Sequence, residues 1–298
     1  MRRVLPILGL SLALLTAACG DDDRQAETGD RPASSSTSST TSATGASGDQ
    51  PGAGGDHDHG ATGGGTTDAA LLTVDVHGGF VPIEHSVGDT AEVVVLRDGR
   101  VLSGAPTIAI YPGPALPAFQ VSTADRAAVD EAVAAFEALD PDADYDQGTQ
   151  QQIADAPFTT VTLRKDGGTT SITAYALGME DATGPRGRLQ AVVDRINGLA
   201  TGTGETAYEP TALRVHDVTD LVGPPGEAGP GEPSGTVRDW PIPHSGAACS
   251  VVRDPARVRA ALEVLRASTQ LDHFRTDVGE RRLVVVPLLP GDPGCAEG

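Results

Sequence analysis

The stretch AEVVVLRDGRVLSG, residues 91–104, decides the fold class. An apolar run and a shorter apolar return flank Asp98-Gly99. Asp-Gly between two such runs is the strongest local signal of a β-hairpin, because a type I′ turn needs positive φ at both central residues. The stretch FTTVTLRKDGGTTSITAYAL, residues 158–177, repeats this pattern around Asp166-Gly167-Gly168. Two antiparallel hairpins are therefore expected.

One helix is expected between the hairpins and another after them. The stretch STADRAAVDEAVAAFEALD, residues 122–140, has Ser122 as its expected N-cap and Asp125 three residues on. The stretch RGRLQAVVDRING, residues 186–198, has Gly198 near its expected C-cap. Apolar residues recur on one face of each helix: Val129, Val133 and Phe136 in the first, and Leu189, Val192, Val193 and Ile196 in the second. This order predicts an α+β fold of antiparallel hairpins packed with a few amphipathic helices.

A softer boundary falls in GLATGTGETAYEP, and a second, smaller set of elements follows it. TALRVHDV (211–218) predicts a strand, and DPARVRAALEVLRAS (254–268) a helix with Asp254 as cap and a proline in its first turn. RRLVVVPLLP (281–290) predicts a final strand whose valine run is buried on both faces. The loop at 222–235 is too rich in Pro and Gly to pack. We therefore expect two α+β units, 71–200 and 201–298, and the sequence leaves open whether they share one core.

The N-terminus predicts export. Arg2 and Arg3 precede an apolar run of about a dozen residues, which is too short to span a membrane and is typical of a secretory signal peptide, residues 1–18. Small residues then lead to Cys19, and this arrangement resembles the lipobox of bacterial lipoproteins, although Thr16 stands where leucine is usual. The resemblance implies a diacylglycerol on the Cys19 sulfur and attachment to the extracytoplasmic face of the cell membrane. The alternative is ordinary cleavage after Ala18, which would release a soluble protein.

Residues 19–70 predict a disordered tether. The segment consists mainly of Gly, Ser, Thr, Asp and Pro, has almost nothing to bury, and would hold the folded part on the order of 40 Å from its anchor. The whole chain has a formal net charge of −20, which repels phosphate backbones and argues against nucleic-acid binding. Beyond Cys19 two cysteines remain, Cys249 and Cys295, and an even pair in an exported protein predicts a disulfide.

Several short motifs in the exported part are turns and strand ends. They include DGRV, IYPGPALP, DAPFTTVTL, YALG, Trp240-Pro241 and PLLPGDPGC. On these motifs, residues of roughly 75–296 resemble an uncharacterised family of actinobacterial secreted lipoproteins. The resemblance implies the compartment and the fold, and it carries no assigned activity.

Alternating carboxylates in DPDADYD make the best metal candidate: Asp140, Asp142, Asp144 and Asp146. Oxygen ligands suit Ca²⁺, but an EF-hand would have glycine where Tyr145 stands and glutamate where Gln151 stands. A solvated acidic loop is the competing interpretation. His57 and His59 in the tether could hold Zn²⁺ or Cu²⁺ only weakly. The remaining histidines are scattered singly: His77, His85, His216, His244 and His273.

Catalytic and cofactor signatures do not stand out. There is no G-x-S-x-G or S-x-x-K motif, and the single G-x-G-x-x-A match at Gly202 follows a helix rather than a strand, so no cofactor is expected. The first hypothesis is a non-catalytic, membrane-anchored module that binds an envelope protein, a peptide or a small ligand. The alternatives are an extracytoplasmic hydrolase, which needs a histidine beside Ser, Asp or Glu, and a weak divalent-cation-binding surface protein.

Overall fold

The computed structural model describes residues 68–108, 110–146, 153–179, 183–222 and 234–295. All of them belong to a unit that runs from Ala61 to Gly298. The predicted signal peptide, Cys19, nearly all of the tether with its two histidines, and most of the Pro/Gly-rich loop lie outside the described residues. Within the described ranges no helix is long and apolar enough to cross a membrane.

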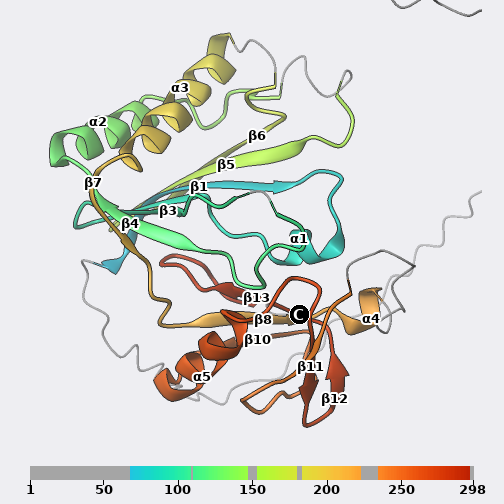
Figure 1. The fold of residues 1–298 in the computed structure, drawn as a ribbon. Coiled ribbons are helices and arrows are strands. Elements are labelled where there is room, and N and C mark those ends of the chain that lie inside the picture. Colours follow the sequence, from blue (N-terminus) through green and yellow to red (C-terminus); the bar gives the residue numbers. More distant parts are fainter. Residues whose placement is uncertain (1–67, 109, 147–152, 180–182, 223–233, 296–298) are drawn as a thin grey trace, which may run out of the picture. The chain divides into compact units, whose positions relative to one another are not determined.

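A seven-stranded antiparallel sheet forms the first layer of this α+β fold (Figure 1). Its strand order is β6-β5-β1-β2-β3-β4-β7. The strands are β1 (Ala70–Gly78), β2 (Val93–Leu96), β3 (Arg100–Gly104), β4 (Phe119–Thr123), β5 (Pro157–Lys165), β6 (Gly168–Tyr175) and β7 (Thr203–Ala207). The two predicted hairpins are confirmed as β2–β3 and β5–β6.

The β2–β3 turn is not the type I′ turn that the sequence predicted. Gly99 has a φ of 92°, but the φ of Asp98 is not positive. Its carboxylate instead accepts hydrogen bonds from the backbone N–H of Arg100 at 3.0 Å and from Arg100 Nε at 2.7 Å. Three residues connect these strands, and a three-residue loop needs only one left-handed residue after a type I turn.

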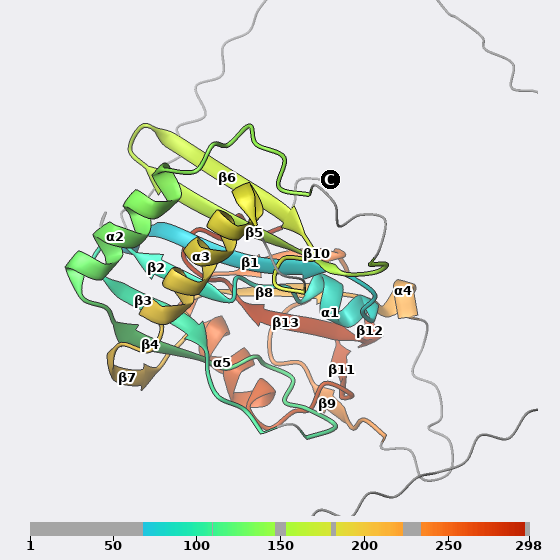
Figure 2. The ribbon, with the colours of Figure 1, turned by 90° about the horizontal axis from the view of Figure 1, so that it is seen from above.

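Two helices, α2 (Arg126–Glu137) and α3 (Gly184–Leu199), cover one face of this sheet (Figures 1 and 2). All seven apolar side chains predicted to face inward are buried in the core that these helices share with the sheet. Leu72, Val74 and Val161 supply the sheet side and are 0% exposed. Each such side chain contributes about 1.5–3 kcal/mol by leaving water, so this core carries much of the stability of the first layer.

The predicted N-cap of α2 was wrong, whereas Gly198 does lie near the C-cap of α3. Ser122 lies in β4, where its partner across the sheet is Val101, and its hydroxyl donates to the carbonyl of Ala200 at 3.3 Å. Strand pairing continues through Thr123, so Asp125 is the residue that caps α2, accepting from Ala127 N at 2.8 Å. Helix α3 ends at Leu199, and its C-cap is Ala200, two residues beyond Gly198, with right-handed φ and ψ.

The second layer contains two three-stranded sheets. One has the order β10-β8-β13 and is antiparallel; the other has the order β12-β11-β9, in which β9 and β11 are parallel. The strands are β8 (Leu213–Asp217), β9 (Val237–Asp239), β10 (Cys249–Val252), β11 (His273–Thr276), β12 (Gly279–Arg281) and β13 (Leu283–Pro287). Three helices remain. Helix α1 (Ile83–Val87) precedes β2 in the chain, and α4 (Thr219–Val222) and α5 (Pro255–Leu265) follow β8 and β10.

Helix α5 begins as predicted and packs against the β10-β8-β13 sheet. Asp254 caps it by accepting from Arg257 N at 2.9 Å. The second core contains Leu213, Val215, Leu283 and Val285 from the strands together with the α5 residues Val258, Ala261, Leu262 and Leu265. Trp240 and Phe274 stack edge to face within it, with ring centroids 5.3 Å apart. The two layers therefore have separate main cores.

The layers are nevertheless connected. The predicted boundary after residue 200 precedes β7, which pairs with β4, so the chain changes sheets between Ala207 and Leu213. Beyond β13, Leu289 packs in a third cluster with Val94, Leu96 and Leu102 on the face of the seven-stranded sheet that the helices leave uncovered.

The predicted disulfide is confirmed. Cys249 in β10 and Cys295 are joined with a Cα–Cα distance of 5.7 Å. The bond ties the C-terminal segment, including Leu289 and Asp292, to the second layer.

We expect the Cys249→Ser/Cys295→Ser variant to lose about 4 kcal/mol of unfolding free energy, because the bond closes a loop with a sequence separation of 46 residues. Urea denaturation of the oxidised wild type and the variant measures this difference. The reduced wild type is the control and should match the variant. An unchanged midpoint would contradict the role given to the bond.

Candidate functional site

A cleft of about 480 Å³ lies where the two layers meet. One wall comes from β1 through Val76, and another from α1 and the loop between α1 and β2, which includes Asp89, Thr90 and Glu92. Strand β13 forms the third side through residues 282–286. Parts of two loops, 111–117 and 269–271, complete it. The cleft is thus built from segments that are far apart in the sequence.

Arg214 fixes the geometry of this region. Its Nη1 contacts both carboxylate oxygens of Asp292, at 2.9 and 3.0 Å, and the two side chains are only 11% and 12% exposed. Its Nη2 donates to the carbonyl of Asp89, in the loop that enters β2. One guanidinium therefore holds a strand of the second layer, the C-terminal segment and the cleft wall together.

A second arginine closes one end of the cleft. Arg282, just before β13, pairs with Glu84 of α1 at 2.7 Å. Each side chain is about one quarter exposed. The Nε of Arg282 is buried and has no hydrogen-bond partner among the described residues. This ion pair joins the layers at the point where β13 begins.

Strand β13 is the edge of its sheet and pairs only with β8. The carbonyl of Arg282 and the N–H of Leu288 are bonded toward β8, so by the alternation of an antiparallel ladder Leu283 and Val285 direct their N–H and C=O groups the other way. Both residues line the cleft while their side chains pack in the α5 core. Their main-chain groups therefore face the cleft. Because Leu283 is only 7% and Val285 1% exposed, these groups lie at its floor.

Two carboxylates in the cleft are electrostatically strained. Burial raises the pKa of Glu92, and the nearby charge of Asp75 raises it further. Burial and then Asp75 also raise the pKa of Asp89, while a backbone hydrogen bond from Gly78 and the histidines His77 and His85 lower it by smaller amounts. Because the folded state disfavours their ionised forms, these two groups reduce stability as the pH rises through their ordinary range.

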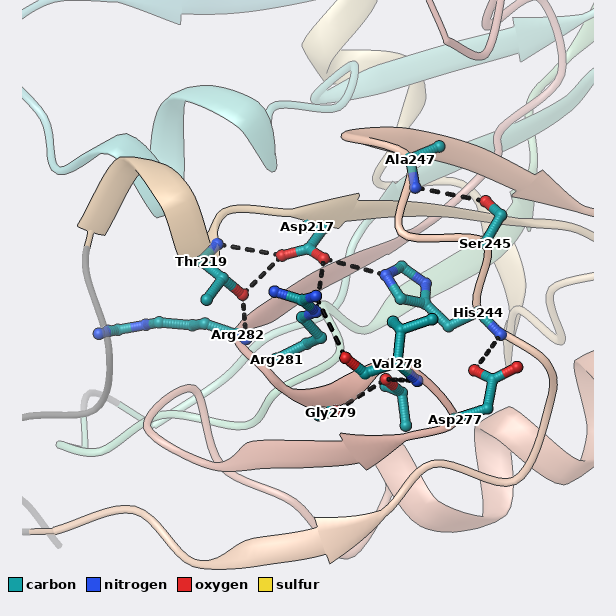
Figure 3. Close-up of polar contacts among 11 residues, drawn as sticks. Asp217, Thr219, His244, Ser245, Ala247, Asp277, Val278, Gly279, Arg281 and Arg282 are labelled. Atoms are coloured by element: carbon teal, nitrogen blue, oxygen red, sulfur yellow. Dashed lines mark hydrogen bonds and ion pairs between the residues drawn. The ribbon is translucent and has the colours of Figure 1, made fainter.

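A buried histidine–aspartate pair lies beside the start of β13 (Figure 3). His244 Nε2 is 3.0 Å from Asp217 Oδ2, and the two side chains are 2% and 8% exposed. The hydroxyl of Thr219 donates to Asp217 Oδ1 at 2.6 Å and accepts from the backbone N–H of Arg282 at 2.8 Å. Arg281 Nε lies 3.6 Å from the same carboxylate as His244.

This network has the contacts of a structural clamp rather than of a catalytic dyad. A hydrolase requires the histidine to activate a nucleophile, but the hydroxyl in this network, that of Thr219, is bonded to Asp217 rather than to the His244 ring. Both side chains are also withdrawn from solvent. Burial by itself raises the pKa of Asp217, but hydrogen bonds from Thr219 and His244 outweigh it and the pKa lies below its ordinary value. The clamp therefore fixes the backbone of Arg282 at the cleft.

The aspartates proposed as a calcium site do not converge. Asp140 accepts from the backbone N–H of Asp142 at 3.1 Å, and Asp144 from that of Asp146 at 2.9 Å. Asp146 also accepts from Tyr175 N at 2.7 Å. These carboxylates stabilise the turn after α2, and no group of three potential metal ligands occurs anywhere in the described residues.

The five histidines of the folded part have different surroundings. His85 lines the cleft, and His77 lies 3.7 Å from Asp75. His216 Nε2 is 3.9 Å from Cys249 Sγ. Burial lowers the pKa of His216 and of His273. Only His244 lies within hydrogen-bonding distance of a carboxylate among these five as the structure describes them.

Sequence reasoning missed the residues that matter most here: Asp89, Glu92 and Arg282, which line the cleft, and Arg214, which holds its wall. None belongs to a motif, and their proximity arises from the packing of the layers. The valine run of β13 was predicted to be buried on both faces, but Val284 is partly exposed and lines the cleft.

A comparison of the chain with known protein families, with curated proteins and with solved structures finds no match. The function is therefore inferred from the residues themselves.

We expect Asp217→Asn to lower the unfolding free energy at pH 7 by about 1–3 kcal/mol, because buried donors lose a charged acceptor. The folded-state pKa of Asp217 lies below the unfolded value of 3.8, so its contribution is present above that pH and is lost as the pH falls through the folded value. Urea titrations between pH 2 and 7 should therefore show that the difference in unfolding free energy between wild type and variant becomes smaller at acid pH. The exposed Asp220→Asn is the control, and a difference independent of pH would contradict this assignment.

Proposed function

We propose that this chain is a lipoprotein, anchored through Cys19 on the extracytoplasmic face of the membrane, whose folded part is a non-catalytic binding module. Its binding site is the cleft between the layers. The observation that carries the proposal is the combination, in one cleft, of a strand edge whose outward main-chain groups have no hydrogen-bond partner among the described residues and of carboxylates whose ionised forms the fold disfavours.

Unpaired polar groups and disfavoured charges are costly to keep. A buried main-chain N–H or C=O without a partner costs about 1–3 kcal/mol, so nearly all such groups in proteins are bonded. Binding sites are where a fold tolerates such costs, because the ligand removes them. Both costs occur in the cleft: the unpaired main-chain groups lie along β13, and the disfavoured charges lie on the two carboxylates.

A catalytic role has less support. The only described histidine within hydrogen-bonding distance of a carboxylate, His244, lies in a clamp that holds the start of β13. Its ring and the Asp217 carboxylate are nearly inaccessible to a substrate. The binding module is therefore preferred to the hydrolase, and the dispersed aspartates give no support to a cation-binding protein.

The anchor is supported by the order of charged, apolar and small residues before Cys19 and by the resemblance to bacterial lipoproteins. The acidic chain would avoid nucleic acid, and its contact with the membrane would be through the lipid alone.

We expect the full-length chain, produced in a lipoprotein-processing bacterium, to incorporate labelled palmitate and to partition into the detergent phase. Cys19→Ser should abolish the label and move the protein to the water phase or leave it unprocessed. Cys249→Ser/Cys295→Ser, which removes the two cysteines of the disulfide, should leave the label unchanged. A wild-type protein without label, cleaved after Ala18, would contradict the anchor.

The binding site can be tested in intact cells by photo-crosslinking. Tyr111 lines the cleft and is 68% exposed, so benzoylphenylalanine at this position should give a discrete adduct. The same group at Val278, which is 43% exposed between β11 and β12, should not.

Narrowing the cleft provides the matched comparison. Gln270→Trp adds bulk at the cleft, whereas Glu263→Trp adds the same side chain on the exposed side of α5. The adduct at position 111 should fall several-fold with the first and stay unchanged with the second. Adducts of equal yield in both variants would contradict the cleft as the site.

A further inference from the structure

We propose that the ligand of the cleft is a basic segment of a protein partner, with the head group of an arginine or lysine bound by the carboxylates of Asp89 and Glu92. This inference rests on the proposed function and specifies the chemistry of the partner. Three features of the described residues carry it: uncompensated negative charge, apolar side chains at the rim, and main-chain groups that face the cleft.

The negative charge of the cleft is only partly offset. Asp75 lies close enough to Asp89 and Glu92 to disfavour the ionisation of both. The nearby arginines are already engaged, since Arg282 pairs with Glu84 and Arg214 pairs with Asp292. A cationic group entering the cleft would therefore find carboxylates that gain from its charge, and partial burial makes such a pair stronger than one in open water.

The rim indicates a macromolecule rather than a small cation. Phe80 is 90% exposed and Val81 44%, and both directly precede the cleft residue Pro82. On the other side, Ile110 is 57% exposed beside Tyr111. Exposed aromatic and aliphatic side chains next to a charged pocket are typical of the contact area around an anchoring residue of a protein partner. A small cation such as a polyamine would leave this apolar surface uncovered.

The β13 edge supplies main-chain partners for a peptide. Leu283 directs its N–H and C=O into the cleft, and it is more exposed than Val285. A peptide backbone offers both a donor and an acceptor, so it can satisfy Leu283 in the manner of strand addition, while its basic side chain reaches the carboxylates. The loop opposite is held in place, because Ala115 N donates to Ser268 O and Gln270 N donates to Gly113 O.

Charge argues against two other occupants. A second copy of the chain would bring another acidic cleft to the first, and the net charge of −20 opposes that association. The chain's own segment 20–67 has eight acidic residues and two arginines, a difference of −6, so it is also a poor match. A basic segment of another protein is the complementary choice.

The probe is a pool of fluorescent, end-blocked heptapeptides with arginine at the centre and varied apolar residues on either side. The matched pool replaces arginine by citrulline, which keeps the shape and removes the charge. Fluorescence anisotropy with the folded wild-type chain should show the arginine pool binding at least tenfold more tightly, with affinity that falls as salt is added.

Asp89→Asn/Glu92→Gln should reduce the affinity for the arginine pool about tenfold and remove the preference over citrulline. Asp220→Asn/Glu263→Gln, which removes two exposed carboxylates outside the cleft, should change neither. Loss of folding does not confuse this result, because both cleft carboxylates have raised pKa values and their neutral replacements should be at least as stable near pH 7.

Amide exchange provides an independent readout. The arginine pool should slow exchange at Leu283, whose N–H faces the cleft, and leave Val284 unaffected, because its N–H is directed toward β8. Equal binding of the citrulline pool, full binding by the cleft double variant, or no binding at millimolar peptide would each overturn the inference. If peptides fail while the adduct at position 111 persists, the binding module stands and only its basic partner is wrong; if both fail, both proposals fall.

Discussion

The contact on which the rest of the structure depends is the buried ion pair of Arg214 with Asp292, together with the bond from Arg214 to the carbonyl of Asp89. Each main core lies within one layer, and of the three apolar clusters only the small one around Leu289 joins the layers, so polar contacts contribute to how the layers meet. A guanidinium with two carboxylate contacts and a backbone carbonyl imposes a defined geometry. Removing one partner of such a buried pair costs about 3–5 kcal/mol, because a charge stays uncompensated.

The layers meet tightly at one end of this contact and leave a cleft at the other. Leu289 fills the space below Leu96 and Leu102, and the disulfide keeps the segment that contains Leu289 in place. Toward α1 the layers are joined by polar contacts such as the pair between Arg282 and Glu84. A rigid frame therefore surrounds a cleft whose own polar groups are poorly satisfied, and this contrast is the basis of the functional proposal.

The His244–Asp217 pair illustrates why residue types do not settle function. The combination of a histidine and an aspartate at 3.0 Å is what a hydrolase hypothesis asks for. Here the carboxylate is used by Thr219 and approached by Arg281, and the hydroxyl of Thr219 is used by the backbone of Arg282. Burial and the remaining partners, rather than the identity of the pair, assign it to positioning β13.

The sequence by itself determined the local structure: both hairpins, the inward faces of α2 and α3, the cap of α5 and the disulfide pairing. These depend on turn residues, apolar spacing and the even number of exported cysteines, which act over short distances or by simple counting. It erred at Ser122, because strand pairing with β3 outweighed the local cap signal. Only the tertiary structure decided the cleft, since Asp89, Glu92, Arg214 and Arg282 carry no local pattern and meet through the packing of two layers. The physical reason is that a charge and an unpaired backbone group acquire their energetic meaning from burial and from neighbours distant in the chain.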